Sequence, residues 1–262
     1  INPSIDVFSA DNWTTGSAVT TIASGNTSIN STNIDYPQDM YLRFMHVTKN
    51  TQFKIGSDVV PLKHVLDGFE SDGLVVHLDE YVFESVCQFQ KERMENKLPI
   101  VPISVNLSRA SIHFSDVVDR YVDIVKHKQI PFDCVPIELT ESATLYSEKI
   151  LEITDQLVKA GFKLHMDDFG SGYSSLTSLN ELNFSTVKLD KSLIDYIHQA
   201  RGKKIVQQAI DLGHGLDMKV VAEGVESKEQ RDCLIEMNCD EIQGFYYSKP
   251  LKQEDFIEKL RA

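Results

Sequence analysis

The stretch that decides the fold is Lys163-Leu-His-Met-Asp-Asp-Phe-Gly-Ser-Gly-Tyr-Ser-Ser-Leu176. It begins with the alternation of apolar and polar residues that is typical of a half-buried strand. The alternation ends at two adjacent carboxylates, Asp167 and Asp168, and a loop with two glycines follows. Acidic residues at the carboxyl end of a buried strand are where α/β proteins place metal-dependent chemistry. Two interpretations are open: a metal site, or a strand end at Asp167 with a helix cap at Asp168.

Strand and helix patterns alternate regularly on both sides of this stretch. Strands are predicted at 99–106, 135–140, 162–167, 186–190, 219–223 and 241–244, and helices at 115–128, 148–160, 176–179, 203–212, 228–237 and 253–260. This alternation predicts a parallel sheet with right-handed crossovers. At 262 residues, a closed (β/α)8 TIM-like barrel is favoured over an open doubly wound sheet. The chain has no Gly-x-Gly-x-x-Gly after an early strand, which argues against a dinucleotide-binding fold.

The chain before residue 99 is less regular. Residues 1–38 are rich in Ser, Thr and Asn, and we expect a linker or peripheral segment there, with the barrel domain at 39–262. A short strand is possible at 17–23. The patterns then predict strands at 40–45 and 52–55, a short helix that begins at Pro61, and a longer helix at 75–95.

The composition excludes some classes of function. The formal net charge is -13, which argues against binding to polymeric nucleic acid or an anionic membrane. A phosphate-bearing small ligand is still compatible, because a metal ion can supply positive charge. We see no membrane-spanning run and no signal peptide, and the four cysteines show no C-x-x-C pairing. We therefore expect a cytoplasmic protein with reduced thiols.

Polar side chains recur at the carboxyl ends of the predicted strands, where barrel enzymes place their reactive groups. They are Asn106, Glu138, Glu141, Asp167, Asp168, Lys188, Glu223 and Gln243. Taken singly, each has an ordinary structural explanation, such as a turn cap or a surface ion pair. Together they predict that the carboxyl end of the barrel, its mouth, carries negative charge that cations must neutralise. Oxygen ligands suit Mg²⁺ or Mn²⁺. Two metal ions about 4 Å apart would clamp a phosphodiester. Lys188 could then position or deprotonate a water, if the metal ions lower its pKa.

Six motifs carry a resemblance to a known family. They are Pro102-Ile-Ser-Val-Asn-Leu-Ser108, Ile137-Glu-Leu-Thr-Glu-Ser142, Met166-Asp-Asp-Phe-Gly-Ser-Gly-Tyr-Ser-Ser-Leu176, Val187-Lys-Leu-Asp-Lys-Ser192, Val220-Val-Ala-Glu-Gly-Val-Glu226 and Ile242-Gln-Gly-Phe-Tyr-Tyr-Ser-Lys-Pro250. In this order and spacing they resemble the EAL domain, a bacterial cyclic di-GMP phosphodiesterase module. The resemblance covers about residues 61–260. It implies a barrel with one antiparallel strand and metal-dependent hydrolysis of cyclic di-GMP to linear pGpG.

The resemblance also implies roles for individual residues. Lys188 resembles the residue that holds the hydrolytic water, and Glu141 the glutamate that steadies the loop from Gly170 to Leu176. Gln243 and Pro250 resemble residues near the metal-bound water and the nucleotide. A homodimer through the 168–176 region is implied by analogy alone. The expected metal ligands are Asn106, Glu138, Asp167, Asp168 and Glu223, with Asp168 on the second metal ion.

The triplet that names the family, Glu-Ala-Leu, does not occur in this chain. Two alignments are open. In one, Asp39-Met-Tyr-Leu-Arg43 replaces the family's Glu-Ala-Leu-Leu-Arg, so that Arg43 binds phosphate. In the other, Tyr41–Phe44 matches the preceding strand, and only 56–60 is left for the triplet. An active phosphodiesterase and a catalytically degenerate domain that binds cyclic di-GMP or a protein therefore both stand as hypotheses, with hydrolysis of another phosphodiester as a third.

Overall fold

The computed structural model describes residues 5–8, 19–21, 52–55, 58–61, 75–144, 148–172, 176–251 and 253–259. The chain divides into two compact units, one formed by Asp79–Lys249 and the other by Ile1–Leu78 with Pro250–Ala262. The strand predicted at 40–45 and Arg43 lie outside the described residues. The predicted boundary at residue 38 stays a prediction.

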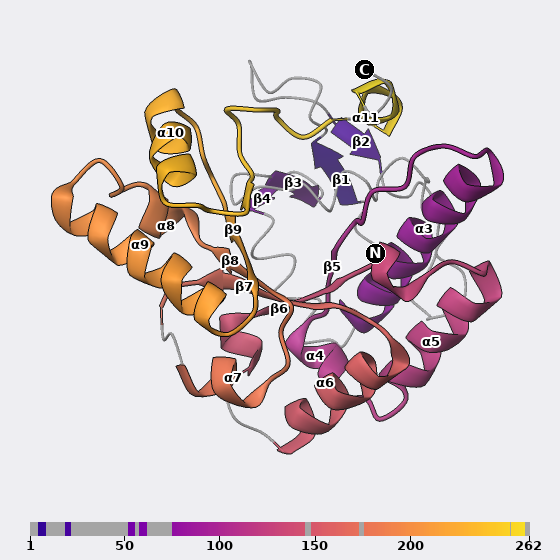
Figure 1. Ribbon diagram of the computed structural model, residues 1–262. Coiled ribbons are helices and arrows are strands. Elements are labelled where there is room, and N and C mark those ends of the chain that lie inside the picture. The colour runs from indigo at the N-terminus through magenta and orange to yellow at the C-terminus, as the bar shows by residue number, and fades with distance from the viewer. Residues whose placement is uncertain are drawn as a thin grey trace. The chain divides into compact units, whose positions relative to one another are not determined.

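The larger unit is built on one parallel sheet of six strands, in the order β10-β9-β8-β7-β6-β5. All five neighbouring pairs are parallel, so each strand pairs with the next one along the chain and all carboxyl ends lie at one edge (Figure 1). This confirms the predicted α/β class. The strands are β5 (Val105–Asn106), β6 (Ile137–Thr140), β7 (Leu164–Phe169), β8 (Thr186–Leu189), β9 (Lys219–Ala222) and β10 (Glu241–Ile242).

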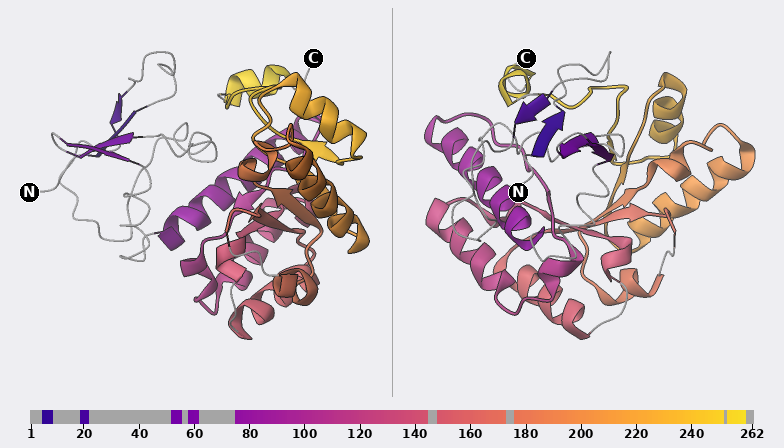
Figure 2. Two further views of the ribbon diagram at one scale, coloured as in Figure 1. Left: turned by 90° about the vertical axis from the view of Figure 1, so that its left-hand side faces the viewer. Right: turned by 180° about the vertical axis from the view of Figure 1, so that it is seen from behind.

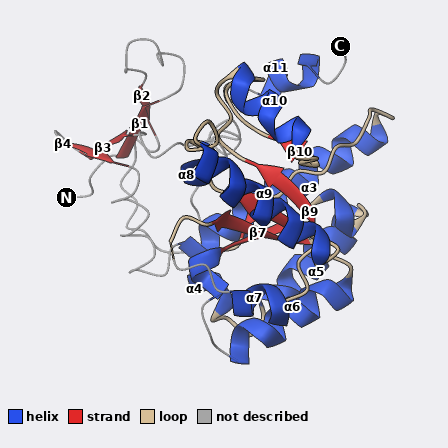
Figure 3. Cartoon of the chain, turned by 60° about the vertical axis from the view of Figure 1, so that its left-hand side comes forward, coloured by secondary structure: helices blue, strands red, loops and turns tan. Residues whose placement is uncertain are grey.

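Helices lie outside the strands of this unit (Figures 1 and 3), and the view from behind shows the same outer layer (Figure 2). They are α3 (Val75–Glu95), α4 (Arg109–Ile112), α5 (Val117–Lys128), α6 (Glu148–Ala160), α7 (Leu176–Glu181), α8 (Lys191–Ile194), α9 (Ala200–Gly215) and α10 (Lys228–Glu236), with the 3-10 turns η3 (Phe132–Cys134) and η4 (Glu141–Thr144). Among the described helices, none is both long and apolar enough to cross a membrane.

Burial explains why these strands read as apolar runs. All four residues of β8 are buried, as are the last three of β9, which is expected for parallel strands covered on both faces. Gly213 of α9 shows how closely a helix approaches. A Cβ there would lie 2.5 Å from Val220 and 3.1 Å from Val187, so this position needs a residue without a side chain.

An aromatic cluster ties α3 and α5 to the start of β7. Phe83 stacks on Tyr121 with ring centroids 4.0 Å apart, and Phe162 meets the edges of Phe83 and Phe132. Phe83 is 0% exposed and Tyr121 2%. Buried aromatic pairs of this kind contribute about 0.5–1.5 kcal/mol beyond the burial of their area.

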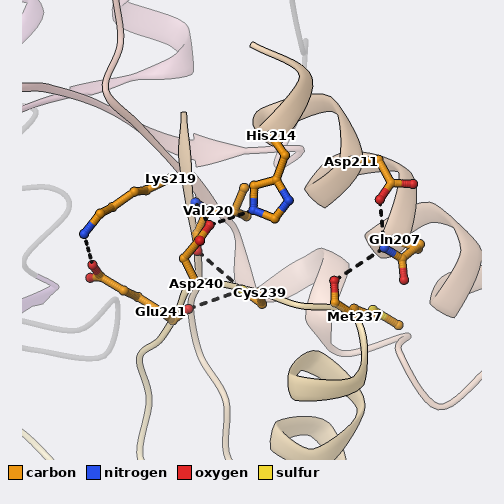
Figure 4. A network of polar contacts seen from close by, with 9 residues as sticks. All are labelled: Gln207, Asp211, His214, Lys219, Val220, Met237, Cys239, Asp240 and Glu241. Carbon is orange, nitrogen blue, oxygen red and sulfur yellow. Dashed lines mark hydrogen bonds and ion pairs between the residues drawn. The ribbon is translucent and has the colours of Figure 1, made fainter. Parts of the chain in front are cut away.

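A polar network joins the amino ends of β9 and β10, at the edge opposite the strand ends that carry the predicted site (Figure 4). Asp240 Oδ2 accepts a 2.8 Å hydrogen bond from the N–H of Val220 and lies 2.8 Å from His214 Nε2. Cys239 Sγ contacts the carbonyl oxygens of Val220 and Glu241 at 3.4 and 3.3 Å. The network holds the short strand β10 against β9.

The second unit holds an antiparallel sheet with the order β2-β1-β3-β4. Its strands are β1 (Ile5–Phe8), β2 (Val19–Thr21), β3 (Gln52–Ile55) and β4 (Asp58–Pro61), and the unit also contains helix α11 (Gln253–Lys259). The strand predicted at 52–55 is confirmed. Pro61, however, ends β4, so the predicted start of a helix at Pro61 is wrong; the rest of that predicted helix lies outside the described residues. Proline is tolerated here because β4 lies at an edge of the described sheet.

Most predicted strands differ from the observed ones by a few residues, and two of these differences bear on the site. The strand predicted at 99–106 is only Val105–Asn106, because Pro99 and Pro102 lack the N–H group that a sheet requires. Gln90 Nε2 there donates to the carbonyls of Val101 and Cys134 at 2.7 and 2.9 Å. The strand predicted to end at residue 167 continues as β7 to Phe169. The interpretation of Asp168 as a helix cap is therefore wrong.

Candidate functional site

The predicted polar residues lie at the carboxyl edge of the parallel sheet. Asn106 ends β5 and is the register partner of Glu138 on β6. Asp167 of β7 is the partner of Thr140, which lies two residues after Glu138. Lys188 lies on β8, and Glu223 follows the last residue of β9. Each side chain therefore comes from a different strand, and the parallel register brings them together.

Three of the predicted carboxylates converge on the ammonium group of Lys188. The Nζ atom lies 2.9 Å from Glu138 Oε1, 3.0 Å from Asp167 Oδ1 and 2.7 Å from Glu223 Oε1. The side chains of Lys188 and Glu138 are only 9% and 7% exposed. We call these four residues the Lys188 cluster. Its formal charge is minus two, because three carboxylates surround one ammonium.

Burial and the charges within the cluster shift the pKa values of Glu223, Asp167 and Lys188. Burial raises the pKa of Glu223 to about 7, although Lys188 lowers it in part. Burial likewise raises the pKa of Asp167, with Lys188 again opposing the shift. Burial by itself would lower the pKa of Lys188, but Glu138, Asp167 and Glu223 together raise it above the ordinary value. Lys188 is therefore an ammonium ion here. For the pKa of Lys188 to fall low enough for it to deprotonate a water, cations would have to lie beside it.

Asp168 occupies an irregular position next to this cluster. Its φ is 58°, and the register of β7 against β8 shifts between Met166 and Phe169. A left-handed residue in a bulge bends the strand and redirects the side chains on either side of it. The described contacts of Lys188 Nζ are with Glu138, Asp167 and Glu223.

Glu141 lies in η4, directly after β6, and is 4% exposed. Its Oε2 atom accepts a 3.3 Å hydrogen bond from the N–H of Gly170. Gly170 has a φ of +90°, and a Cβ there would lie 2.4 Å from Leu193, so both the backbone and the space require glycine. The contact ties η4 to the first residue of the predicted loop. The steadying role of Glu141 stays a prediction.

The remaining predicted site residues are more peripheral. Gln243 is exposed, and its backbone donates to Ala222 O at 2.8 Å and accepts from Val225 N at 3.1 Å. Asn106 is also exposed, and Pro250 is half-buried. Their predicted roles stay predictions, as does that of Arg43, which lies outside the described residues.

Two polar contacts at this edge were not predicted. Ser104 donates a 2.5 Å hydrogen bond to Glu138 Oε1. Asp79 of α3 accepts from the N–H of Ser108 at 2.9 Å and from the Ser111 hydroxyl at 2.6 Å, which fixes the turn after Asn106. Ser104 could have been found by alternation, because it lies two residues before Asn106. Asp79 gave no such signal.

The cluster supplies the donor set of a hard divalent cation. Within the described ranges, no group of three His, Cys, Asp or Glu side chains is arranged to hold a metal ion directly. The carboxylates surround an ammonium group at 2.7–3.0 Å, whereas Mg²⁺ holds its ligands at about 2.0–2.1 Å. The three carboxylates still fit a cation, since they converge on one positive centre.

The fold and the cluster define a class: a TIM-like α/β barrel with an acidic mouth centred on a lysine. The EAL domain family matches the chain over residues 53–250, and the chain belongs to this family. It is 32% identical over 192 residues to the signaling protein YkoW of Bacillus subtilis. The aligned residues cover 71% of this chain and 24% of YkoW. It is also 32% identical over 194 residues to MucR of Pseudomonas aeruginosa, a bifunctional diguanylate cyclase and cyclic di-GMP phosphodiesterase, with coverage of 73% and 28%.

Solved structures agree with this assignment. The MucR phosphodiesterase in complex with cyclic di-GMP superposes with a TM-score of 0.71 at 28% identity, over 79% of this chain and 85% of that one. An EAL domain protein of Listeria monocytogenes gives a TM-score of 0.67 at 28% identity, over 80% and 83%. The predicted EAL-type barrel is thereby confirmed. The chain spans about a quarter of the length of the curated relatives YkoW and MucR.

Proposed function

We propose that this chain hydrolyses cyclic di-GMP to linear pGpG with the help of Mg²⁺ or Mn²⁺. The observation that carries the proposal is the convergence of Glu138, Asp167 and Glu223 on Lys188 at the carboxyl edge of the sheet. Support comes from MucR, which is named as a cyclic di-GMP phosphodiesterase and whose solved phosphodiesterase contains that dinucleotide.

Five residues would hold two divalent cations: Asn106, Glu138, Asp167, Asp168 and Glu223. Bound cations would polarise the phosphodiester and lower the pKa of a water molecule. The carboxylates would keep the cations in place at the centre of the mouth, and their burial would strengthen each electrostatic contact with the phosphate.

Lys188 and Glu141 would act beside the cations. Lys188 Nζ, which now touches three carboxylates, would hold the attacking water by donating a hydrogen bond to its oxygen. Glu141 would keep Gly170 in place through the backbone N–H, and so would orient the loop that follows Asp167 and Asp168. Gln243, Pro250 and Arg43 would contact the dinucleotide or its bound water.

The second candidate is a receptor that binds cyclic di-GMP without hydrolysing it. The observation that favours it is the lack of a Glu-Ala-Leu triplet anywhere in the chain. By the resemblance to the family, the glutamate of that triplet would be a metal ligand, and its loss together with the phosphate-binding strand would lower the rate by orders of magnitude. Binding could survive, because contacts from other strands would remain.

One assay separates the two candidates. The full chain is incubated with cyclic di-GMP and either Mg²⁺ or Mn²⁺, pGpG is measured by chromatography, and binding is measured by calorimetry with Ca²⁺ in place of these ions. Binding with release of pGpG supports the phosphodiesterase. Binding without pGpG supports the receptor, and no binding contradicts both candidates.

A homodimer through the 168–176 region and a cytoplasmic location complete the proposal. Leu176, which begins α7, is 62% exposed, and a large exposed apolar side chain beside the predicted loop is compatible with a contact between subunits. Light scattering of the full chain and of Leu176→Asp would test this. A mass that is unchanged by the substitution would argue against this interface.

A further inference from the structure

Ser104 shares a carboxylate oxygen with Lys188. Its hydroxyl group donates a 2.5 Å hydrogen bond to Glu138 Oε1, and the same oxygen lies 2.9 Å from Lys188 Nζ. Hydrogen bonds from a hydroxyl to a carboxylate are short and strong when the acceptor is ionised. Two donors from two different segments therefore converge on one atom of a predicted metal ligand.

The backbone around Ser104 is held firmly against β6. Ile103 N donates to Cys134 O at 3.1 Å, Val105 N to Pro136 O at 2.9 Å, and Leu107 N to Glu138 O at 2.9 Å. These bonds lie on both sides of Ser104 along the chain, and Val105 is only 2% exposed. The position of the Ser104 hydroxyl group is therefore set by the sheet and does not depend on a free loop.

We propose that Ser104 is a positioning residue for the metal ligand Glu138. Its hydroxyl group holds Oε1 so that the carboxylate keeps one orientation towards the point where Asp167 and Glu223 also converge. A carboxylate fixed in this way loses less freedom when a cation binds. This inference rests on the proposed metal-dependent function, and it adds a residue that touches neither the cation nor the substrate.

The expected loss of metal affinity can be taken from hydrogen bonds that orient metal ligands in other proteins. Removing a hydrogen-bond partner that orients a metal ligand typically weakens metal binding by about 10–100-fold. We expect Ser104→Ala to weaken Mn²⁺ binding by at least about 10-fold. Ser104→Thr keeps the hydroxyl group and should restore most of the affinity.

Ser185 offers a matched control. It is half-buried like Ser104, and its hydroxyl group donates a single 3.0 Å hydrogen bond to the carbonyl oxygen of Leu164. It precedes β8, at the amino edge of the sheet, away from the Lys188 cluster. Ser185→Ala therefore removes a comparable hydroxyl group and leaves the carboxylates untouched.

The test is a titration of the full chain with Mn²⁺ in the absence of substrate, with free Mn²⁺ measured by electron paramagnetic resonance. The proposal expects a raised Kd for Ser104→Ala and a Kd within about threefold of the parent for Ser104→Thr and Ser185→Ala. A parent-like Kd for Ser104→Ala would overturn the inference and leave the proposed function standing. An equal loss in Ser185→Ala would also overturn it, since the effect would then be general. A parent chain that binds no Mn²⁺ would overturn the proposed function together with the inference.

Discussion

Replacing Lys188 by methionine would remove the ammonium group that the described residues place among one buried and two half-buried carboxylates. For the 2.9 Å contact with Glu138, the Coulomb energy at an effective dielectric constant of about 20 is ~6 kcal/mol. Desolvation of the buried charges offsets most of this attraction. Removing one partner of a buried ion pair costs about 3–5 kcal/mol, because the remaining charge is left uncompensated. We expect Lys188→Met to lower the free energy of unfolding by that amount at pH 8 in the presence of EDTA.

The assay is urea denaturation followed by circular dichroism, with Lys159→Met as the control. Lys159 pairs with Asp155 on the surface, and their side chains are 74% and 49% exposed, so its loss should cost less than about 1 kcal/mol. A Lys188→Met chain within about 1 kcal/mol of the parent would refute the reasoning, since burial of the pair predicts a larger cost.

The pH dependence gives this prediction a second readout. Burial raises the pKa of Glu223 to about 7 in the folded chain, and loss of Lys188 removes the charge that opposes this shift. A carboxyl group with a raised folded pKa contributes stability that is present at low pH and lost as the pH rises through the folded pKa. Glu223 ionises near pH 7 in the parent but at a higher pH in the variant, so the deficit of Lys188→Met should grow between about pH 6 and pH 8. A deficit that shrinks over this interval would contradict the assigned charges.

Two further predictions concern stability. Phe83→Ala should lower the free energy of unfolding by about 3–5 kcal/mol, because the ring is fully buried against Tyr121; a loss below about 1 kcal/mol in urea melts would contradict this packing. Asp240→Ala should cost about 1–2 kcal/mol, because the N–H of Val220 and the ring of His214 lose their acceptor. Burial would raise the pKa of Asp240, but these two partners lower it below its ordinary value of 3.8. Its contribution is therefore present above about pH 4 and should disappear in melts at lower pH, whereas a difference that persists at pH 2 would contradict the pairing.

The regular parts of the fold could be predicted from the sequence. The helices at 75–95 and 148–160 have the predicted bounds. A long amphipathic pattern shows where the helical period begins and where it ends. The helices α4 and α8 were missed, since four residues are too few to show a helical period. The short length of β5 and the extent of β4 depend on the positions of prolines and of tertiary hydrogen bonds. The periodicity of apolar residues in the sequence does not show these positions.

The sequence predicted which polar residues lie together at the carboxyl edge of the sheet, but not which of them contact one another. Strand ends identified Glu138, Asp167 and Glu223, because parallel strands bring their carboxyl ends to one edge. That all three would meet Lys188 Nζ depends on side-chain directions across four strands, which single strands do not specify. The bulge at Asp168 was likewise invisible, since it arises from the register between β7 and β8.

The most direct test of the Lys188 cluster as a phosphodiesterase site is the rate of pGpG formation by the parent chain and by Glu138→Gln, with Mn²⁺ and saturating cyclic di-GMP. Glutamine keeps the shape of the side chain and its hydrogen bond with Ser104 but removes the negative charge that a metal ion requires. We expect pGpG from the parent and a loss of at least about 100-fold in the rate of the variant. Equal rates in the two chains would contradict it.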